Sequence, residues 1–119
     1  MKSKKIISVK FFRLSSNREP VRELLLSLTR EDKKIVGEDI KTVELGWPVG
    51  MPVAEKLDTD LWQVRSTISR NRRVRVLFTV FRSQMVLLHA FIKKTPKTPK
   101  GELDLGKRRK NRVLGGGSK

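Results

Sequence analysis

Two stretches of alternating residues constrain the fold of this chain most strongly. Residues 73–80 and 85–93 each repeat with a period of two, and Arg82-Ser83-Gln84 between them is short enough for a hairpin turn. Because successive side chains of a strand point to opposite faces, both stretches predict strands with an apolar face on the core. The even-numbered residues form that face: Val74, Val76, Phe78, Val80, Val86, Leu88, Ala90 and Ile92.

The rest of the sequence predicts two further strands and two helices beside this hairpin. Strands are predicted at residues 6–12 and 61–65, and residues 69–72 connect the latter to the hairpin. One apolar helical face is formed by Val21, Leu24, Leu25 and Leu28. A second helix is predicted from a Thr29 cap, with a buried stripe of Val36, Ile40 and Val43. The pattern therefore predicts an α+β fold, in which an N-terminal helical hairpin packs on one face of an antiparallel sheet of about four strands.

A chain of 119 residues supports one hydrophobic core, so we expect a single domain over residues 1–112. Residues 102–112 predict a short, very basic helix, and residues 113–119 a disordered C-terminal tail. Nothing reads as a transmembrane span or a signal peptide, and a cytoplasmic protein is the expectation.

Positive charge is concentrated in the second half of the chain. The sequence has 28 Lys and Arg against 12 Asp and Glu, a net charge of +16. Ten of the twelve acidic residues lie in residues 1–60, and none lies from Leu61 to Gly101, where ten basic residues occur. This asymmetry favours a polyanionic partner, with RNA or DNA first, because each phosphate neutralised by Lys or Arg releases counterions.

The odd-numbered face of the predicted sheet carries the candidates for chemistry. Alternation places Arg75, His89 and Lys93 on one side of adjacent strands, and Arg65 joins them if its strand pairs in the matching register. Arginine can grip a phosphate and stabilise a phosphorane-like transition state. A His, or a Lys whose pKa is lowered by cationic neighbours, can move protons. RNA brings its own nucleophile, the 2′-hydroxyl, so the pattern predicts phosphoryl chemistry on RNA.

The composition also limits metal chemistry. Without Cys and with a single His, the chain has neither a thiolate site nor a multi-histidine site, and we expect no cofactor. The lack of carboxylates in residues 61–101 agrees with a route that needs no metal. A basic sheet face serves plain RNA binding more often than catalysis, so a non-catalytic RNA- or ribosome-binding module stays open. A DNA-binding regulator ranks last, because the only helical hairpin lies in the nearly neutral half.

Several segments together resemble a known family. The order of Leu45–Pro52, Lys56–Arg65, Arg72–Phe78 and Leu87–Pro99 is similar to the HigB-like branch of the RelE toxin superfamily, the phage-derived toxins of type II toxin–antitoxin modules. Its most specific elements are Leu-Trp-x-x-Arg at residues 61–65 and His-x-Phe-x-Lys-Lys-Thr at residues 89–95. The resemblance covers residues 6–112.

This resemblance implies an activity, partners and a site. It implies an mRNA interferase, a metal-independent endoribonuclease that cleaves mRNA on the ribosome by 2′-OH attack and so inhibits translation. It implies a cognate helix-turn-helix antitoxin of the HigA type, with operator DNA reached only through that antitoxin. Arg65 and Arg75 match the arginines that hold the scissile phosphate, and Lys93 and Lys94 match the basic pair that ends the last strand. His89 is the first candidate for general base or acid, and Lys93 is its competitor.

The chain departs from some relatives in having no Tyr, so a C-terminal catalytic tyrosine is not available. The other basic residues of the second half, with one aromatic, are expected to contact mRNA or ribosomal RNA: Arg70, Arg72, Arg73, Phe91, Lys97, Lys100, Lys107, Arg108, Arg109 and Lys110.

Overall fold

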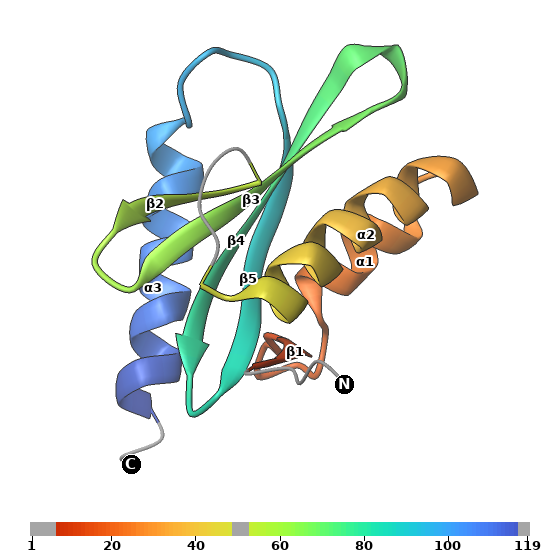
Figure 1. Ribbon diagram of the computed structural model, residues 1–119. Helices are drawn as coiled ribbons and strands as arrows, with labels where there is room; N and C mark the ends of the chain where they lie inside the picture. The colour runs from red at the N-terminus through yellow and green to blue at the C-terminus, as the bar shows by residue number, and fades with distance from the viewer. Residues whose placement is uncertain (1–6, 49–52, 117–119) are drawn as a thin grey trace, which may run out of the picture.

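The computed structural model describes residues 7–48 and 53–116, which form a mixed α+β fold of five strands and three helices (Figure 1). The sheet has the order β1-β5-β4-β3-β2. Its strands are β1 (Ser8–Phe11), β2 (Ala54–Asp58), β3 (Leu61–Ile68), β4 (Arg72–Phe81) and β5 (Gln84–Lys93). The helices are α1 (Pro20–Leu26), α2 (Arg30–Gly46) and α3 (Lys100–Gly116), with a short 3-10 turn at Ser69–Asn71. No helix of the described ranges combines the length and apolar character needed to cross a bilayer.

The N-terminal helical hairpin covers one face of the sheet, as expected (Figure 1). Pro20 begins α1, where its fixed φ and missing N–H fit the first helical turn. The Thr29 side chain caps α2 by accepting a hydrogen bond from Asp32 N at 3.2 Å. The buried stripes of both helices then pack against the sheet in the larger core cluster, through Val21, Leu25, Val36, Ile40 and Val43.

Two features of the sheet differ from the expected four antiparallel strands. Residues 54–58 form the fifth strand, β2, which the sequence hid because Ala-Glu-Lys-Leu-Asp is poor in β-branched and aromatic residues. β1 pairs with β5 in parallel, whereas β2 to β5 pair antiparallel. Parallel strands need a long connection, and β1 has one, because α1 and α2 follow β1 in the chain before the other strands begin.

The helix α3 covers the opposite face of the sheet and is longer than expected (Figure 1). Leu103 and Val113 pack on a second core cluster formed by Phe12, Leu61, Leu77, Val86, Leu88 and Phe91. The helix continues to Gly116, so residues 113–116, expected in the disordered tail, belong to its last turn. The sheet is therefore buried on both faces, and the basic α3 is part of the domain's packing.

A β-bulge in β5 corrects the expected assignment of faces. Leu77 pairs with His89, but the next pair joins Phe78 to Leu87, so Leu88 is the extra residue. From Gln84 to Leu87 the alternation is therefore inverted: Met85 and Leu87 lie in the core under α1 and α2. Val86 and Leu88, expected on that face, lie in the cluster under α3.

Close contact between α3 and the sheet depends on Gly106. A Cβ built on Gly106 would lie 2.5 Å from Leu77 Cδ2, and Leu77 is fully buried. We expect Gly106→Leu to lift α3 from the sheet and to lower the free energy of unfolding by about 1–3 kcal/mol, as overpacking does. Chemical denaturation measures this. The control Gly37→Ala lies in α2 with open space at its Cβ and should stabilise the protein by up to about 1 kcal/mol. Equal effects of both substitutions would contradict the packing role of Gly106.

Candidate functional site

Two like-charged pairs lie side by side at one end of the sheet. The register pairs Arg65 with Arg75 across β3 and β4, and Arg73 with Lys93 across β4 and β5. The matching register expected for Arg65 is therefore present. Residues two apart on a strand point to the same face, so all four side chains belong to the face that α3 covers further along.

This arrangement works against stability. Like charges directly opposite each other on adjacent strands destabilise a sheet. Two adjacent cationic pairs on three neighbouring strands are therefore unfavourable for folding alone. Such a cluster is typical of a site that receives an anionic ligand.

Arg75 is the most buried member of the cluster. It is 3% exposed, its Nη1 donates to Val74 O at 3.1 Å, and its buried Nε has no hydrogen-bond partner among the described residues. Burial, followed by the charges of Arg65 and Arg73, lowers its pKa from the ordinary value of arginine. A guanidinium has five donors, and the Arg75 side chain lines an open hollow, so it can donate to a phosphate oxygen that enters this hollow.

Lys93 is the residue of the cluster whose protonation is most easily changed. Burial lowers its pKa, and the charges of Arg75, Arg65 and Arg73 lower it further. All these causes favour the neutral amine, which is a base. The shift is the one expected for a Lys with cationic neighbours, and the structure identifies three arginines as those neighbours.

Two open hollows surround the cluster and share Arg73. The first, of about 380 Å³, is lined by Val53, Arg65, Thr67, Arg73 and Arg75. The second, of about 290 Å³, is lined by Asn71, Arg73, Lys93, Lys94, Thr95 and Pro96. A nucleic-acid backbone lying across Arg73 would therefore contact Arg65 and Arg75 in the first hollow. It would also contact Lys93 and Lys94 in the second.

His89 lies in a different environment from the cluster. It is four residues from Lys93, roughly 13 Å along the strand, and neither hollow is lined by it. Its Nε2 lies 2.5 Å from Glu102 Oε1 in the first turn of α3, its ring stacks on Phe91, and its side chain is 14% exposed. The geometry therefore favours Lys93 over His89 as the candidate proton carrier next to Arg65, Arg73 and Arg75.

Sequence reasoning missed two polar residues next to the cluster. Gln63 is 2% exposed, its Nε2 donates to Glu55 Oε1 at 2.8 Å, and its Oε1 is buried without a partner among the described residues. Glu55 raises the pKa of both Arg75 and Lys93, opposing the larger downward shifts. Glu55 lies outside the acid-free stretch of residues 61–101, but it acts on the cluster from the neighbouring strand. Recognising residues 54–58 as a strand was the missing step, since β2 brings Glu55 opposite Gln63.

Several residues expected to contact RNA bond to other parts of the protein. Arg72 donates to the buried Asp32 at 2.9 Å, which ties the turn after β3 to the start of α2. In α3, Lys107 pairs with Asp58, Lys110 donates to Thr59 O, and Arg109 donates to Leu88 O at the bulge. These bonds anchor α3 to the sheet. Phe91 is 7% exposed within the second core cluster, so it is not an open platform for a base.

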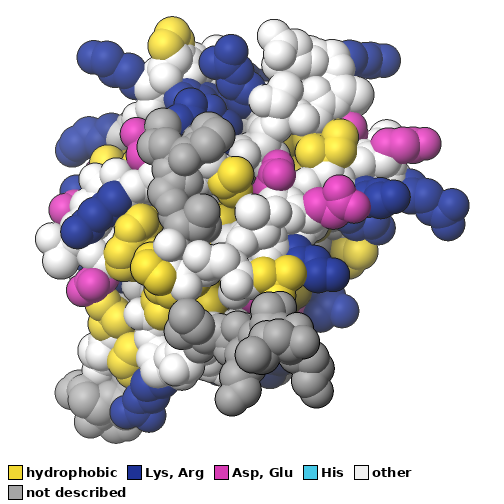
Figure 2. All heavy atoms as spheres, viewed as in Figure 1, with side chains coloured by type: hydrophobic (Ala, Val, Ile, Leu, Met, Phe, Trp, Pro, Cys, Tyr) yellow, Lys and Arg dark blue, Asp and Glu magenta, His cyan; other side chains and the backbone are white. Residues whose placement is uncertain are grey.

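The remaining expected contacts are accessible. The exposed residues are Arg70, Arg73, Lys94, Lys97, Lys100 and Arg108. Arg73 and Lys94 line the hollows, whereas Arg70 lies in the turn before β4 with a φ of 61°. On the face shown in Figure 2, Lys and Arg side chains project around the outline, and Asp and Glu lie between them. Charge on that face is mixed, in contrast to the uniformly basic cluster of β3 to β5.

Together these groups can do phosphoryl chemistry of a simple kind. Arg65, Arg73 and Arg75 can hold the non-bridging oxygens of a phosphate and stabilise added charge in the transition state. Neutral Lys93 can accept a proton, and the Glu55 carboxylate is a second acceptor nearby.

Comparison with known families finds a match, which covers most of the chain. The sequence profile of the family described as "Phage derived protein Gp49-like", which is RelE-like and toxin-like, matches residues 23–111. The matched range includes α2, α3 to residue 111, all the strands except β1, and every residue of the cationic cluster. No protein with a curated description matches the chain.

Proposed function

This chain belongs to the phage-derived Gp49-like family, a toxin-like family, and we propose that it is the toxin of a type II toxin–antitoxin module of the HigB kind. Its activity would be ribosome-dependent cleavage of mRNA, which inhibits translation. The observation that carries the proposal is the cationic cluster at two open hollows, in which Arg65 pairs with Arg75 and Arg73 pairs with Lys93.

The proposed reaction uses the RNA's own 2′-hydroxyl. Neutral Lys93 takes the proton of the 2′-OH as its oxygen attacks the adjacent phosphorus, while Arg75 and Arg65 stabilise the charge on the non-bridging oxygens. The bond from phosphorus to the 5′-oxygen breaks, and that oxygen takes a proton from Lys94, which lines the same hollow as Lys93. The products are a 2′,3′-cyclic phosphate and a 5′-hydroxyl end.

The ribosome and an antitoxin complete the proposal. A small open hollow gives little control over the conformation of a flexible RNA, so the ribosome would hold the mRNA in the conformation for attack. A HigA-like helix-turn-helix antitoxin would neutralise the toxin. The second candidate is a non-catalytic RNA- or ribosome-binding module. In that case the same cationic cluster would bind the RNA, and Lys93 would transfer no proton.

Mapping of mRNA 5′ ends after brief induced expression tests the proposal. We expect discrete new 5′-hydroxyl ends inside reading frames, at translated codons, together with growth arrest. The control is the same induction with translation initiation blocked, which should remove the cuts if the ribosome is required. Intact transcripts with arrested translation would support the non-catalytic module instead.

A further inference from the structure

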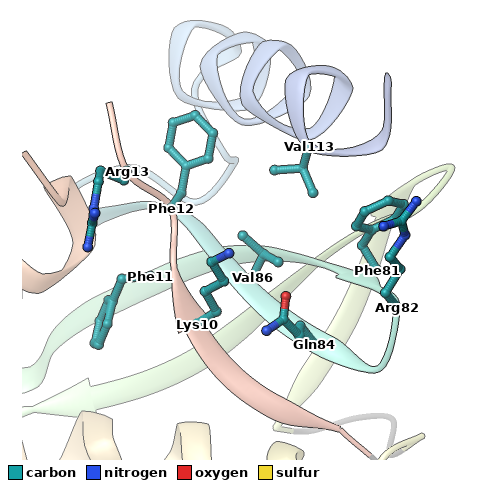
Figure 3. A pocket seen from close by; sticks show the side chains of 9 residues that line it. All are labelled: Lys10, Phe11, Phe12, Arg13, Phe81, Arg82, Gln84, Val86 and Val113. Atoms are coloured by element: carbon teal, nitrogen blue, oxygen red, sulfur yellow. The ribbon is translucent and has the colours of Figure 1, made fainter. Parts of the chain in front are cut away.

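A third hollow lies at the end of the sheet opposite the cationic cluster (Figure 3). It has a volume of about 370 Å³ and opens between β1, the turn from β4 to β5, and the C-terminal part of α3. Phe81 is six residues from Arg75 along β4, roughly 20 Å away. This hollow is therefore separate from the cationic cluster.

The floor and walls of the hollow are apolar and aromatic. Figure 3 shows Phe12 and Val113 on one side, Val86 beneath them, and Phe81 beside the turn. The Arg82 guanidinium lies over the Phe81 ring at 5.0 Å from its centroid, which extends the aromatic surface by a planar cation. Such a stack is a surface on which a nucleobase of any sequence can pack.

The rim of the hollow is polar and positively charged. Lys10 and Arg82 are exposed, and neither forms an ion pair with a described carboxylate. Arg13, also on the rim, pairs with Glu19 at 3.3 Å. The Gln84 amide supplies both a donor and an acceptor, which is the chemistry needed to bond the edge of a base.

We propose that this hollow binds one nucleobase and an adjoining phosphate of single-stranded RNA. The base would lie against the Phe81 and Arg82 stack, and Lys10 and Arg82 would neutralise the phosphate. The volume falls within the range of small-ligand pockets, about 300–1,000 Å³. An aliphatic partner side chain would use the apolar walls but leave Gln84 and the two cations without partners, so the lining favours a nucleotide over an apolar peptide.

The inference rests on RNA as the proposed ligand, but it does not require cleavage. The hollow would add affinity and fix the direction of the strand, whereas chemistry would stay at the cationic cluster. Its test therefore uses a short single-stranded RNA with 2′-O-methyl groups, which has no nucleophile and stays intact whether or not the protein is a ribonuclease.

Binding of this RNA is measured by fluorescence anisotropy over a range of salt concentrations. We expect Phe81→Leu, which keeps an apolar side chain but removes the ring, to weaken binding about tenfold. Arg82→Asn, chosen because Asn tolerates the φ of 52° at this position, should lower the magnitude of the salt slope by about 0.7 for one lost phosphate contact. The control Lys41→Gln removes an exposed cation of α2 and should change neither quantity at this site.

Photo-crosslinking of the same RNA carrying 5-iodouridine locates the contact. Crosslinks to Phe81 support the inference, and crosslinks confined to β3 and the loop after β5, with unchanged affinity of both variants, overturn it. Binding of a poly-glutamate peptide that Phe81→Leu and Arg82→Asn abolish, with RNA binding unchanged, also overturns it and identifies a protein-docking site. Failure of the proposed nuclease would appear separately, as intact transcripts in cells.

Discussion

Replacement of Arg75 by Met is expected to abolish most of the proposed cleavage activity without weakening the fold. Loss of one donor group that stabilises transition-state charge lowers the rate by about 10²–10³-fold at oxyanion-binding sites of enzymes. The guanidinium is almost fully buried, and its pKa is lowered first by that burial and then by Arg65 and Arg73, so its charge opposes folding. Substitution by an apolar side chain of similar length should therefore leave the free energy of unfolding unchanged or raise it by about 1 kcal/mol.

The measurement combines cleavage of an mRNA on purified ribosomes with thermal unfolding of the same protein samples. Lys41→Met, on the exposed side of α2, is the matched control for loss of one positive charge. An Arg75→Met protein that keeps full activity would show that the cationic cluster does not hold the scissile phosphate. A strongly destabilised Arg75→Met protein would show that the guanidinium contributes to folding, contrary to its unbonded Nε.

Much of the fold follows from patterns that act locally. Alternation over residues 73–80, the Thr29 cap and the stripe of Val36, Ile40 and Val43 depend on neighbours in sequence, and the structure confirms each of them. The bulge at Leu88 does not follow from the pattern, because both faces of β5 near it are apolar. Because Met85, Val86, Leu87 and Leu88 are all apolar, a shift of the strand register by one residue here would move no polar side chain into the core.

The site could be predicted in part for a similar reason. The cationic side chains were assignable because charge alternates with apolar residues on β4, which fixes their face. The role of His89 was not assignable, because its partner Glu102 lies beyond a loop and reaches it only when α3 packs on the second face. Gly106 breaks the apolar spacing of α3 in the sequence, but the same residue allows the helix to approach Leu77 closely.

Substitution of Lys93 should change the pH dependence of cleavage as well as its rate. The pKa of Lys93 is lowered by burial and by three neighbouring arginines, so its neutral form becomes available at a lower pH than for an ordinary lysine. If neutral Lys93 is the base, the rate rises with pH and levels off at this lowered pKa. Lys93→Arg keeps the positive charge but cannot deprotonate, and we expect it to lower the rate by about 10²–10⁴-fold and to remove this rise.

Two further variants separate Lys93 from its competitor and from simple charge effects. Arg75→Met removes the arginine that lowers the pKa of Lys93 most, so the residual activity should level off at a higher pH than in the unsubstituted protein. His89→Gln should leave the rate within a few-fold, because His89 pairs with Glu102 and lies roughly 13 Å along β5 from Lys93. Pre-steady-state cleavage rates measured across pH decide whether Lys93 or His89 transfers the proton. A pH profile that is unchanged in Lys93→Arg but lost in His89→Gln would assign the proton transfer to His89.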